Sequence, residues 1–240
     1  MEILSLSDGT ALDIDRKETF RYLGYHFGGK VSPDPELEKL VDELTEKIKK
    51  VITPRCIYEI YSLENDGETC RLYHKTGEQE TPDCLLNINS RKLAAHLKGC
   101  DSVLLFAATV GPGADTIIRR YSAGSSLKPA ILQAAGASAI EAYADLVTDI
   151  IRKDHPNLKM RFSPGYGDFS LEHQKDFFRM LDIEKNLGIS LNDALLMTPT
   201  KSITAVIGVL PDQNSNQYDP SLTLRMTNGA AQDDKRSCSG

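Results

Sequence analysis

The sequence predicts an α+β domain in which a mainly antiparallel, twisted sheet is flanked by helices. The clearest indication is Asn65-Asp66-Gly67, which lies between two short runs with strand character. Asp-Gly accepts the positive φ of a tight hairpin turn, so these runs predict adjacent antiparallel strands rather than a β–α–β unit. The continuous apolar run 103–110 has the composition of a buried strand, and 202–209 is rich in the β-branched residues typical of strands.

Two helices are expected in an N-terminal part, residues 1–52. Asp15 or Asp13 is placed to cap a short helix that ends at Gly24. A second, amphipathic helix runs from the proline-rich segment at 32–35 to about residue 51. Its Glu/Lys face indicates a solvated surface, and we assign it no function. Its apolar positions recur at helical spacing: Leu37, Leu40, Val41, Leu44 and Ile48.

A helix over 90–98 precedes the buried strand at 103–110. Gly111-Pro112-Gly113 then leads into a further helix that ends near Tyr121. A strand, a glycine loop and a helix can hold an anion at the helix N-terminus. The alternative is a sharp strand-to-helix turn, which is the more frequent use of such glycines.

The longest helical stretch covers about 127–153 and is apolar on several sides, which predicts a central, buried helix. The elements expected after it are a loop at 161–168, a helix at 171–185, a helical turn from Ser190 or Asn192 through Leu196, and the strand at 202–209. The predicted domain covers 1–212, with an α/β core at 53–212. The polar residues 213–240 are expected to be largely disordered.

Composition narrows the class of protein. The chain has 240 residues, a formal net charge of −6 and 40% hydrophobic residues, which suits a globular domain. It has no long Lys/Arg run and no apolar stretch near the ~18–20 residues that span a bilayer, so neither nucleic acid nor a membrane is an expected partner. Five scattered cysteines without a Cys-x-x-Cys pair predict no metal site; as buried, reduced thiols they favour the cytoplasm. These are Cys56, Cys70, Cys84, Cys100 and Cys238.

The segment Arg161-Phe-Ser-Pro-Gly-Tyr166 combines groups that suit a ligand site. A guanidinium can bind a carboxylate through two parallel hydrogen bonds. Pro164 stiffens the loop, and Gly165 lets its backbone approach a ligand closely. Tyr166 supplies a ring that can pack on a flat group. The local chemistry alone also fits a plain surface turn with a solvated arginine.

Glu141 lies within the long apolar helix, where an ionised carboxylate in apolar surroundings needs a partner. A ligand hydroxyl, a ligand amine or the Arg161 guanidinium would serve. The alternative is that Glu141 lies on one wet stripe of the helix, because Asp145 and Asp149 follow it at i+4 and i+8.

Several motifs in the same order resemble the S-adenosylmethionine-binding activation domain of cobalamin-dependent methionine synthase. Ala139-Ile-Glu-Ala-Tyr-Ala-Asp-Leu146 is similar to the family helix that supplies a ligand-contacting glutamate, which falls on Glu141. The Arg161 segment is similar to the family loop Arg-Pro-Ala-Pro-Gly-Tyr. Downstream, Met180-Leu-Asp-Ile-Glu-Lys resembles Leu-Leu-Asp-Val-Glu-Lys. The resemblance covers roughly residues 125–210.

The resemblance implies a site and a role. Glu141, Arg161, Ser163 and Tyr166 match family positions that contact S-adenosylmethionine, and Gly165 belongs to the same loop. No residue of the chain is implied to be catalytic. In the family the domain caps the corrinoid, and reduction, often by flavodoxin, traps the methyl group of S-adenosylmethionine on inactive cob(II)alamin. We therefore expect a methionine synthase activation-like fold, with cobalamin carried by a partner protein.

Three functions follow as hypotheses. The first is a component of methionine biosynthesis that reactivates a cobalamin-dependent methionine synthase in trans, since no cobalamin, homocysteine or folate module is seen in the sequence. The second is an S-adenosylmethionine-dependent partner of another corrinoid methyltransferase. The third is a non-catalytic binding module that keeps the fold without the ligand.

Overall fold

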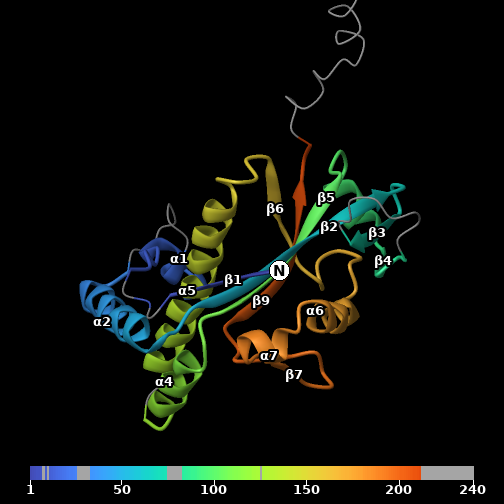
Figure 1. Cartoon of the computed structure of the whole chain (residues 1–240). Coiled ribbons are helices and arrows are strands. Elements are labelled where there is room, and N and C mark those ends of the chain that lie inside the picture. The colour runs from blue at the N-terminus through green and yellow to red at the C-terminus, as the bar shows by residue number, and fades with distance from the viewer. Residues whose placement is uncertain (7–8, 10, 26–32, 75–82, 125, 212–240) are drawn as a thin grey trace, which may run out of the picture. The chain divides into compact units, whose positions relative to one another are not determined.

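The computed structural model describes residues 1–6, 9, 11–25, 33–74, 83–124 and 126–211, and the predicted tail at 213–240 lies outside this set. Residues Met1–Leu210 form one compact unit. At its centre is a seven-stranded sheet in the order β4-β3-β2-β5-β9-β6, with β1 beside β2 (Figure 1). Every strand pair described is antiparallel, so the predicted fold class is confirmed. The strands are β1 (Glu2–Ser5), β2 (Arg55–Asn65), β3 (Thr69–His74), β4 (Leu86–Asn89), β5 (Ser102–Thr109), β6 (Leu158–Phe162) and β9 (Ser202–Val209), with a separate pair, β7 (Ser190–Leu191) and β8 (Met197–Thr198).

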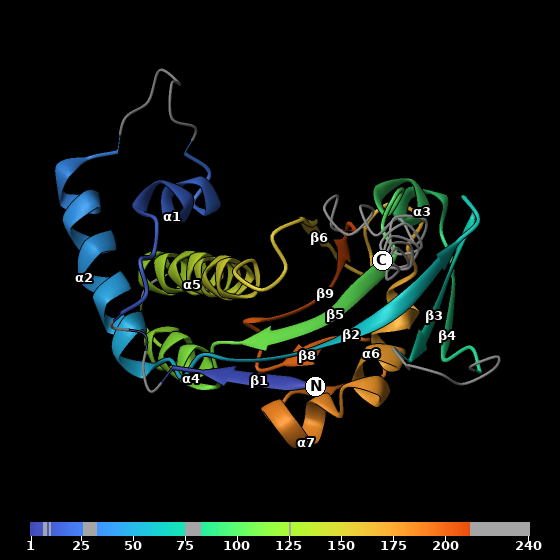
Figure 2. The same cartoon turned by 45° about the horizontal axis from the view of Figure 1, so that its top comes forward.

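Helices cover both faces of this sheet. Figure 2 shows α1, α2, α4 and α5 gathered on one side, with α3, α6 and α7 on the other. The helices are α1 (Arg16–Tyr22), α2 (Pro35–Val51), α3 (Arg91–His96), α4 (Gly113–Tyr121), α5 (Leu127–Ile151), α6 (Gln174–Met180) and α7 (Ile183–Leu187). A single 3₁₀ turn, Leu171–His173, leads into α6. Two hydrophobic cores result, one on each face of the sheet.

The central strand β5 shows why both faces are covered. All eight of its residues are buried. Because side chains alternate along a strand, Leu104 and Phe106 pack into the core beneath α5, whereas Val103 and Leu105 pack into the core beneath α6 and α7. The continuous apolar run in the sequence therefore reflects a strand without a wet face.

Local signals set the element boundaries, and two of them, the Asp15 cap and the turn at Gly67, were expected from the sequence. The Asp15 carboxylate accepts a hydrogen bond from the Lys17 amide (2.7 Å) and caps α1. Asp34 caps α2 in the same way, with 2.9 Å to the Glu36 amide. Gly67 has a φ of +93° in the β2–β3 turn, as the predicted hairpin requires.

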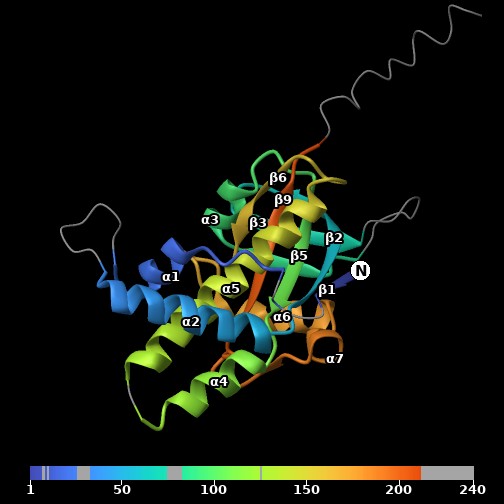
Figure 3. The same cartoon turned by 90° about the vertical axis from the view of Figure 1, so that its left-hand side faces the viewer.

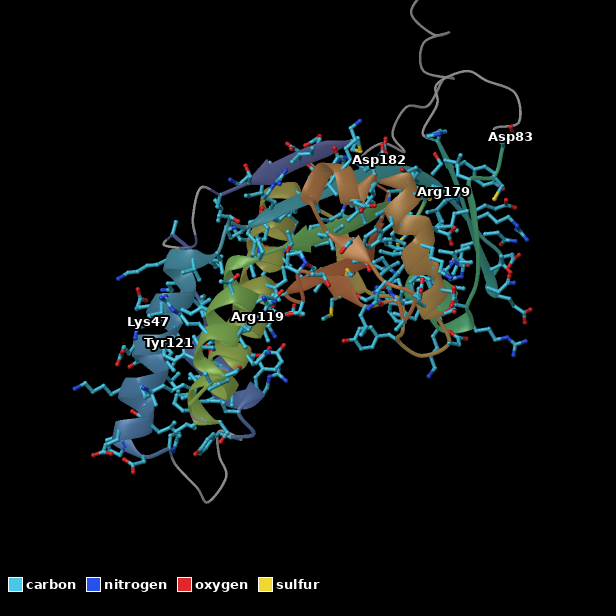
Figure 4. All side chains as sticks on the ribbon, turned by 90° about the horizontal axis from the view of Figure 1, so that it is seen from below. Lys47, Asp83, Arg119, Tyr121, Arg179 and Asp182 are labelled. Atoms are coloured by element: carbon cyan, nitrogen blue, oxygen red, sulfur yellow. The ribbon has the colours of Figure 1, made fainter. Side chains whose placement is uncertain are left out.

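Helix α5 is the central helix that the sequence predicts, with buried residues on most of its sides. Its Tyr143 hydroxyl donates to the Leu4 carbonyl (3.0 Å), which ties the helix to β1. Helix α2 crosses α4 and α5 on their outer side (Figure 3). There the Lys47 ammonium donates to the Tyr121 hydroxyl (3.2 Å), and the two side chains lie side by side in Figure 4.

The Gly111-Pro112-Gly113 loop has a packing explanation. A Cβ on Gly113 would lie 1.8 Å from the Val51 carbonyl oxygen, so a glycine lets the start of α4 meet the end of α2. Gly111 has a φ of +79°, which favours glycine. The alternative of a sharp strand-to-helix turn accounts for both glycines.

Three strands of the seven-stranded sheet were not expected from the sequence. Strand β1 lies in the N-terminal part that was predicted to be helical, and β4 is only four residues long. Strand β6 contains Arg161 and Phe162, which were assigned to a loop. It is a short, half-buried edge strand with a register shift against β9, so its sequence has no continuous apolar run.

Two helical predictions near the C-terminal end of the core are corrected. The predicted helix at 171–185 is interrupted at Asp182, whose φ of +46° separates α6 from α7; Asp182 and Arg179 mark this junction in Figure 4. The predicted helical turn after Ser190 is a two-stranded hairpin, β7–β8. The Asn192 side chain accepts from the Leu196 amide (2.9 Å) there, and such local bonds compete with helix formation.

The described cysteines are unpaired thiols. Cys56 and Cys70 are buried as expected, whereas Cys84 is exposed and Cys100 half-buried; Cys238 lies outside the described residues. Burial raises the pKa of Cys56 to about 11 and that of Cys70 to about 11. Both thiols are therefore protonated at neutral pH. In the part of the chain that is described, no helix is long and apolar enough to cross a membrane.

Candidate functional site

One face of α5 presents polar side chains to the edge strand β6. Glu141, Asp145 and Thr148 lie at i, i+4 and i+7, which places them in one row. Arg161 of β6 reaches all three. Its Nη2 lies 2.9 Å from Glu141 Oε2, and its Nη1 lies 2.8 Å from Asp145 Oδ1 and 3.3 Å from Thr148 Oγ1. One cation thus bridges two carboxylates. Arg161 and Glu141, which are 20 residues apart in the sequence, are in direct contact in the fold.

The exposures of these side chains settle the question left open for Glu141. The Arg161 side chain is 18% exposed, Glu141 45% and Asp145 70%. Glu141 is therefore not a buried carboxylate, and the wet stripe with Asp145 exists. Arg161 is the most buried of the three, so the stripe faces a fixed guanidinium rather than open solvent.

The loop after β6 is held by its own backbone. The Gly165 amide donates to the Phe169 carbonyl (2.7 Å), and the Tyr166 amide donates to the Ser163 carbonyl (3.2 Å). Gly165 has a φ of +95°, a conformation that costs other residues more. The turn leaves Tyr166 66% exposed. Its ring lies edge-on to Phe162, with 6.3 Å between the centroids.

Asp168 anchors this loop to the neighbouring helix α3. Its carboxylate accepts hydrogen bonds from the Ser90 hydroxyl (2.5 Å), the Arg91 amide (3.0 Å) and the Lys92 amide (3.2 Å). These bonds favour the charged form and lower the pKa of Asp168, with the Ser90 bond as the largest cause. No local sequence pattern indicates this anchor, because the partners of Asp168 lie more than seventy residues away along the chain.

We predict that Asp168→Ala loosens the loop. Because the pKa of Asp168 is lowered in the folded state, its contribution to stability is present at neutral pH and is lost as pH falls through that lowered value, below the ordinary 3.8. The melting temperature of the variant should lie a few degrees below that of the wild type at pH 7. Thermal melts should show this difference shrinking below pH 4. An equal difference at pH 3 and pH 7 would contradict the anchor.

The α5 stripe, β6 and the loop enclose a cleft of about 800 Å³. Four of the five residues expected at the site line it: Glu141, Arg161, Ser163 and Tyr166. Gly165 is not among the lining residues and shapes the loop behind them. The far wall comes from Gln174, Met197 and the first residues of β9, 202–204. None of these wall residues was predicted from the sequence to lie at the site.

Acidic and basic side chains lining the cleft are equal in number, but they have different partners. Arg152 pairs with Asp149 (2.5 Å), and the Lys159 ammonium donates to the His96 and Lys98 carbonyls (2.6 and 2.7 Å). Arg161 is the cation next to Glu141 and Asp145. A cation beside two carboxylates, in a cleft of this size, suits a ligand that carries both a carboxylate and a positive group. No cluster of three metal-ligating side chains occurs among the described residues.

Comparison with known proteins gives two matches. Residues 36–219 match the family model described as vitamin B12-dependent methionine synthase, activation domain. Among 13 matching chains of solved structure is a crystal structure of the MetH reactivation domain bound to AdoHcy. It is 16% identical to this chain, with a TM-score of 0.62, and the match covers 88% of this chain and 79% of that one. This likeness establishes a shared fold. Comparison with curated protein sequences finds no significant match.

Proposed function

The chain belongs to the family of vitamin B12-dependent methionine synthase activation domains, and we propose that it binds S-adenosylmethionine in the cleft between α5 and β6. There it supports the reductive methylation of cob(II)alamin on a cobalamin-dependent methionine synthase that it meets in trans. S-adenosylmethionine supplies the methyl group, cobalamin is carried by the partner, and flavodoxin or another reductant supplies the electron. Two buried, unpaired thiols support the predicted cytoplasmic location.

Arg161 binds the carboxylate of the methionine moiety in this proposal. Its present partner Asp145 is 70% exposed, and such exposed ion pairs are worth only about 0–1 kcal/mol. A ligand carboxylate can therefore replace Asp145 at low cost. Asp145 is then free to pair with the ligand ammonium, and Glu141 to accept from a ribose hydroxyl. The zwitterionic product AdoHcy leaves the charge balance of the cleft unchanged, whereas the sulfonium of S-adenosylmethionine adds one positive charge near the α5 carboxylates.

The loop after β6 supplies the other contacts. The backbone near Ser163, which Gly165 allows to turn sharply, faces the adenine ring. Tyr166, exposed at the rim, lies between the ligand and the corrinoid of the partner. The chain thus holds S-adenosylmethionine and the partner's corrinoid in a fixed relative position, which removes much of the entropic cost of a bimolecular step.

The observation that carries the proposal is the Arg161–Glu141–Asp145 cluster in a cleft on a chain of this family. Isothermal titration should show one saturable site for S-adenosylmethionine and for its stable product AdoHcy. Adenosine and methionine added separately should each bind at least about 100-fold more weakly, because each carries only part of the contacts. Absence of heat with either nucleoside at millimolar concentration would favour the non-catalytic binding module.

The partner is tested separately. A methionine synthase core without its own final domain, loaded with cob(II)alamin and supplied with reductant, should recover activity with S-adenosylmethionine only when this chain is added. A heat-denatured sample of the chain is the control. If only a different corrinoid methyltransferase recovers, the second hypothesis replaces the first while ligand binding stands.

A further inference from the structure

Gln174 is the first residue of α6 and lines the cleft opposite α5. It is only 6% exposed. Its side-chain oxygen Oε1 is the one buried side-chain polar atom without a hydrogen-bond partner in the described part of the chain. Buried polar atoms are almost always paired in native proteins, so an unpaired carbonyl on a residue that lines the cleft points to a donor that a ligand supplies.

Two aromatic residues close to Gln174 in the sequence are buried. Phe177, one turn further along α6, is fully buried, and Phe169 before the helix is 1% exposed. The nearby wall of the cleft is the start of β9, which pairs with β5 along its whole length but with β6 only from Val206 onward. Residues 202–205 therefore present an open strand edge, whose backbone groups can also meet a planar ligand.

We propose that Gln174 Oε1 accepts a hydrogen bond from the exocyclic amine of the adenine ring. This assignment rests on the proposed function. S-adenosylmethionine has three kinds of donor: an ammonium, ribose hydroxyls and the adenine amine. The ammonium and the hydroxyls are drawn to the carboxylates of the α5 stripe, since charged acceptors form stronger hydrogen bonds. A neutral amide oxygen in a wall without charged side chains is suited to the neutral amine that remains.

Two ligands and one substitution test this contact. S-inosylhomocysteine differs from AdoHcy by an oxygen in place of the amine. It would therefore place a hydrogen-bond acceptor, instead of a donor, next to Gln174 Oε1. The wild type should bind AdoHcy about tenfold or more tightly than S-inosylhomocysteine, a difference of one buried hydrogen bond. Gln174→Met keeps the length of the side chain without the acceptor. It should bind AdoHcy about tenfold more weakly and lose its preference between the two ligands.

Stability separates a ligand contact from a structural role. Removing an unpaired buried acceptor should leave the melting temperature of the ligand-free protein unchanged or raise it. Lys175→Met, on the neighbouring exposed position, is the matched control and should change neither affinity nor preference. The comparison of AdoHcy with S-inosylhomocysteine uses only the wild-type protein, so it does not depend on whether a variant folds.

Three results would overturn the assignment. Equal affinity of the wild type for the two ligands would show that the adenine amine is not the partner of Gln174. Equal weakening of both ligands by Gln174→Met would move the contact to another part of the nucleoside. A lower melting temperature of ligand-free Gln174→Met with unchanged AdoHcy affinity would make Gln174 structural while the proposed function stands. Failure of the wild type to bind AdoHcy at all would overturn the function itself.

Discussion

Arg161→Met should weaken AdoHcy binding about 100-fold, because the variant loses about 2–3 kcal/mol of charge-assisted hydrogen bonding. The loss has a second cause. Without the guanidinium, Glu141 and Asp145 face the ligand carboxylate with no cation between them. Isothermal titration at constant ionic strength measures the effect directly. The variant should still fold, since Met keeps the aliphatic part of the side chain.

Arg152→Met is the matched control. Arg152 also lines the cleft, but it forms an ion pair with Asp149 near the end of α5. We expect an affinity change of no more than about threefold, the scale of an exposed ion pair. Arg161→Lys should also bind AdoHcy weakly, because an ammonium cannot hold Glu141 and a ligand carboxylate together in the planar geometry of a guanidinium. Equal losses in the Arg161 and Arg152 variants would mean that only the net charge of the cleft matters.

Gly113→Ala should produce the largest loss of stability among single-methyl changes in the N-terminal half. The added Cβ would lie 1.8 Å from the Val51 carbonyl oxygen, and the obstacle is backbone rather than a flexible side chain. Helix α4 or the end of α2 must shift. We expect a loss of about 3 kcal/mol, the upper end of overpacking, and a melting temperature roughly 10 °C lower.

Gly124→Ala tests whether this effect is specific. A Cβ on Gly124 meets no atom within 4 Å, so its melting temperature should stay within about 2 °C of the wild type. Titration of folded Gly113→Ala with inorganic phosphate gives a further readout. If the wild type bound phosphate and a fully stable Gly113→Ala variant did not, this result would favour an anion site at the Gly111–Gly113 loop.

The sequence was informative where local chemistry decides the structure. Asp15 and Asp34 cap their helices, and Gly67 turns the hairpin, because each acts on neighbouring backbone. Helix α5 was recognised because it is long and apolar on several sides. The stripe of Glu141 and Asp145 follows from helical spacing alone, but its exposure does not, since it depends on what packs beside it.

The elements that were missed depend on distant partners. Strand β6 exists because β9 pairs with it, and its five residues carry no pattern strong enough to outweigh the adjacent Pro-Gly turn. Gln174 could not be assigned to the site from the sequence, because only the packed structure shows that its side-chain oxygen is buried without a hydrogen-bond partner. The anchor from Asp168 to α3 likewise joins segments far apart in the chain.

A crystal structure of the chain with AdoHcy tests the central claim most directly. The ligand should lie in the cleft between α5 and β6, with its carboxylate on Arg161, its ammonium toward Asp145 and its adenine ring near Gln174. Density for the ligand elsewhere, or an empty cleft at a saturating concentration that titration has verified, would contradict the claim that Arg161 and the α5 carboxylates together recognise a zwitterionic nucleoside.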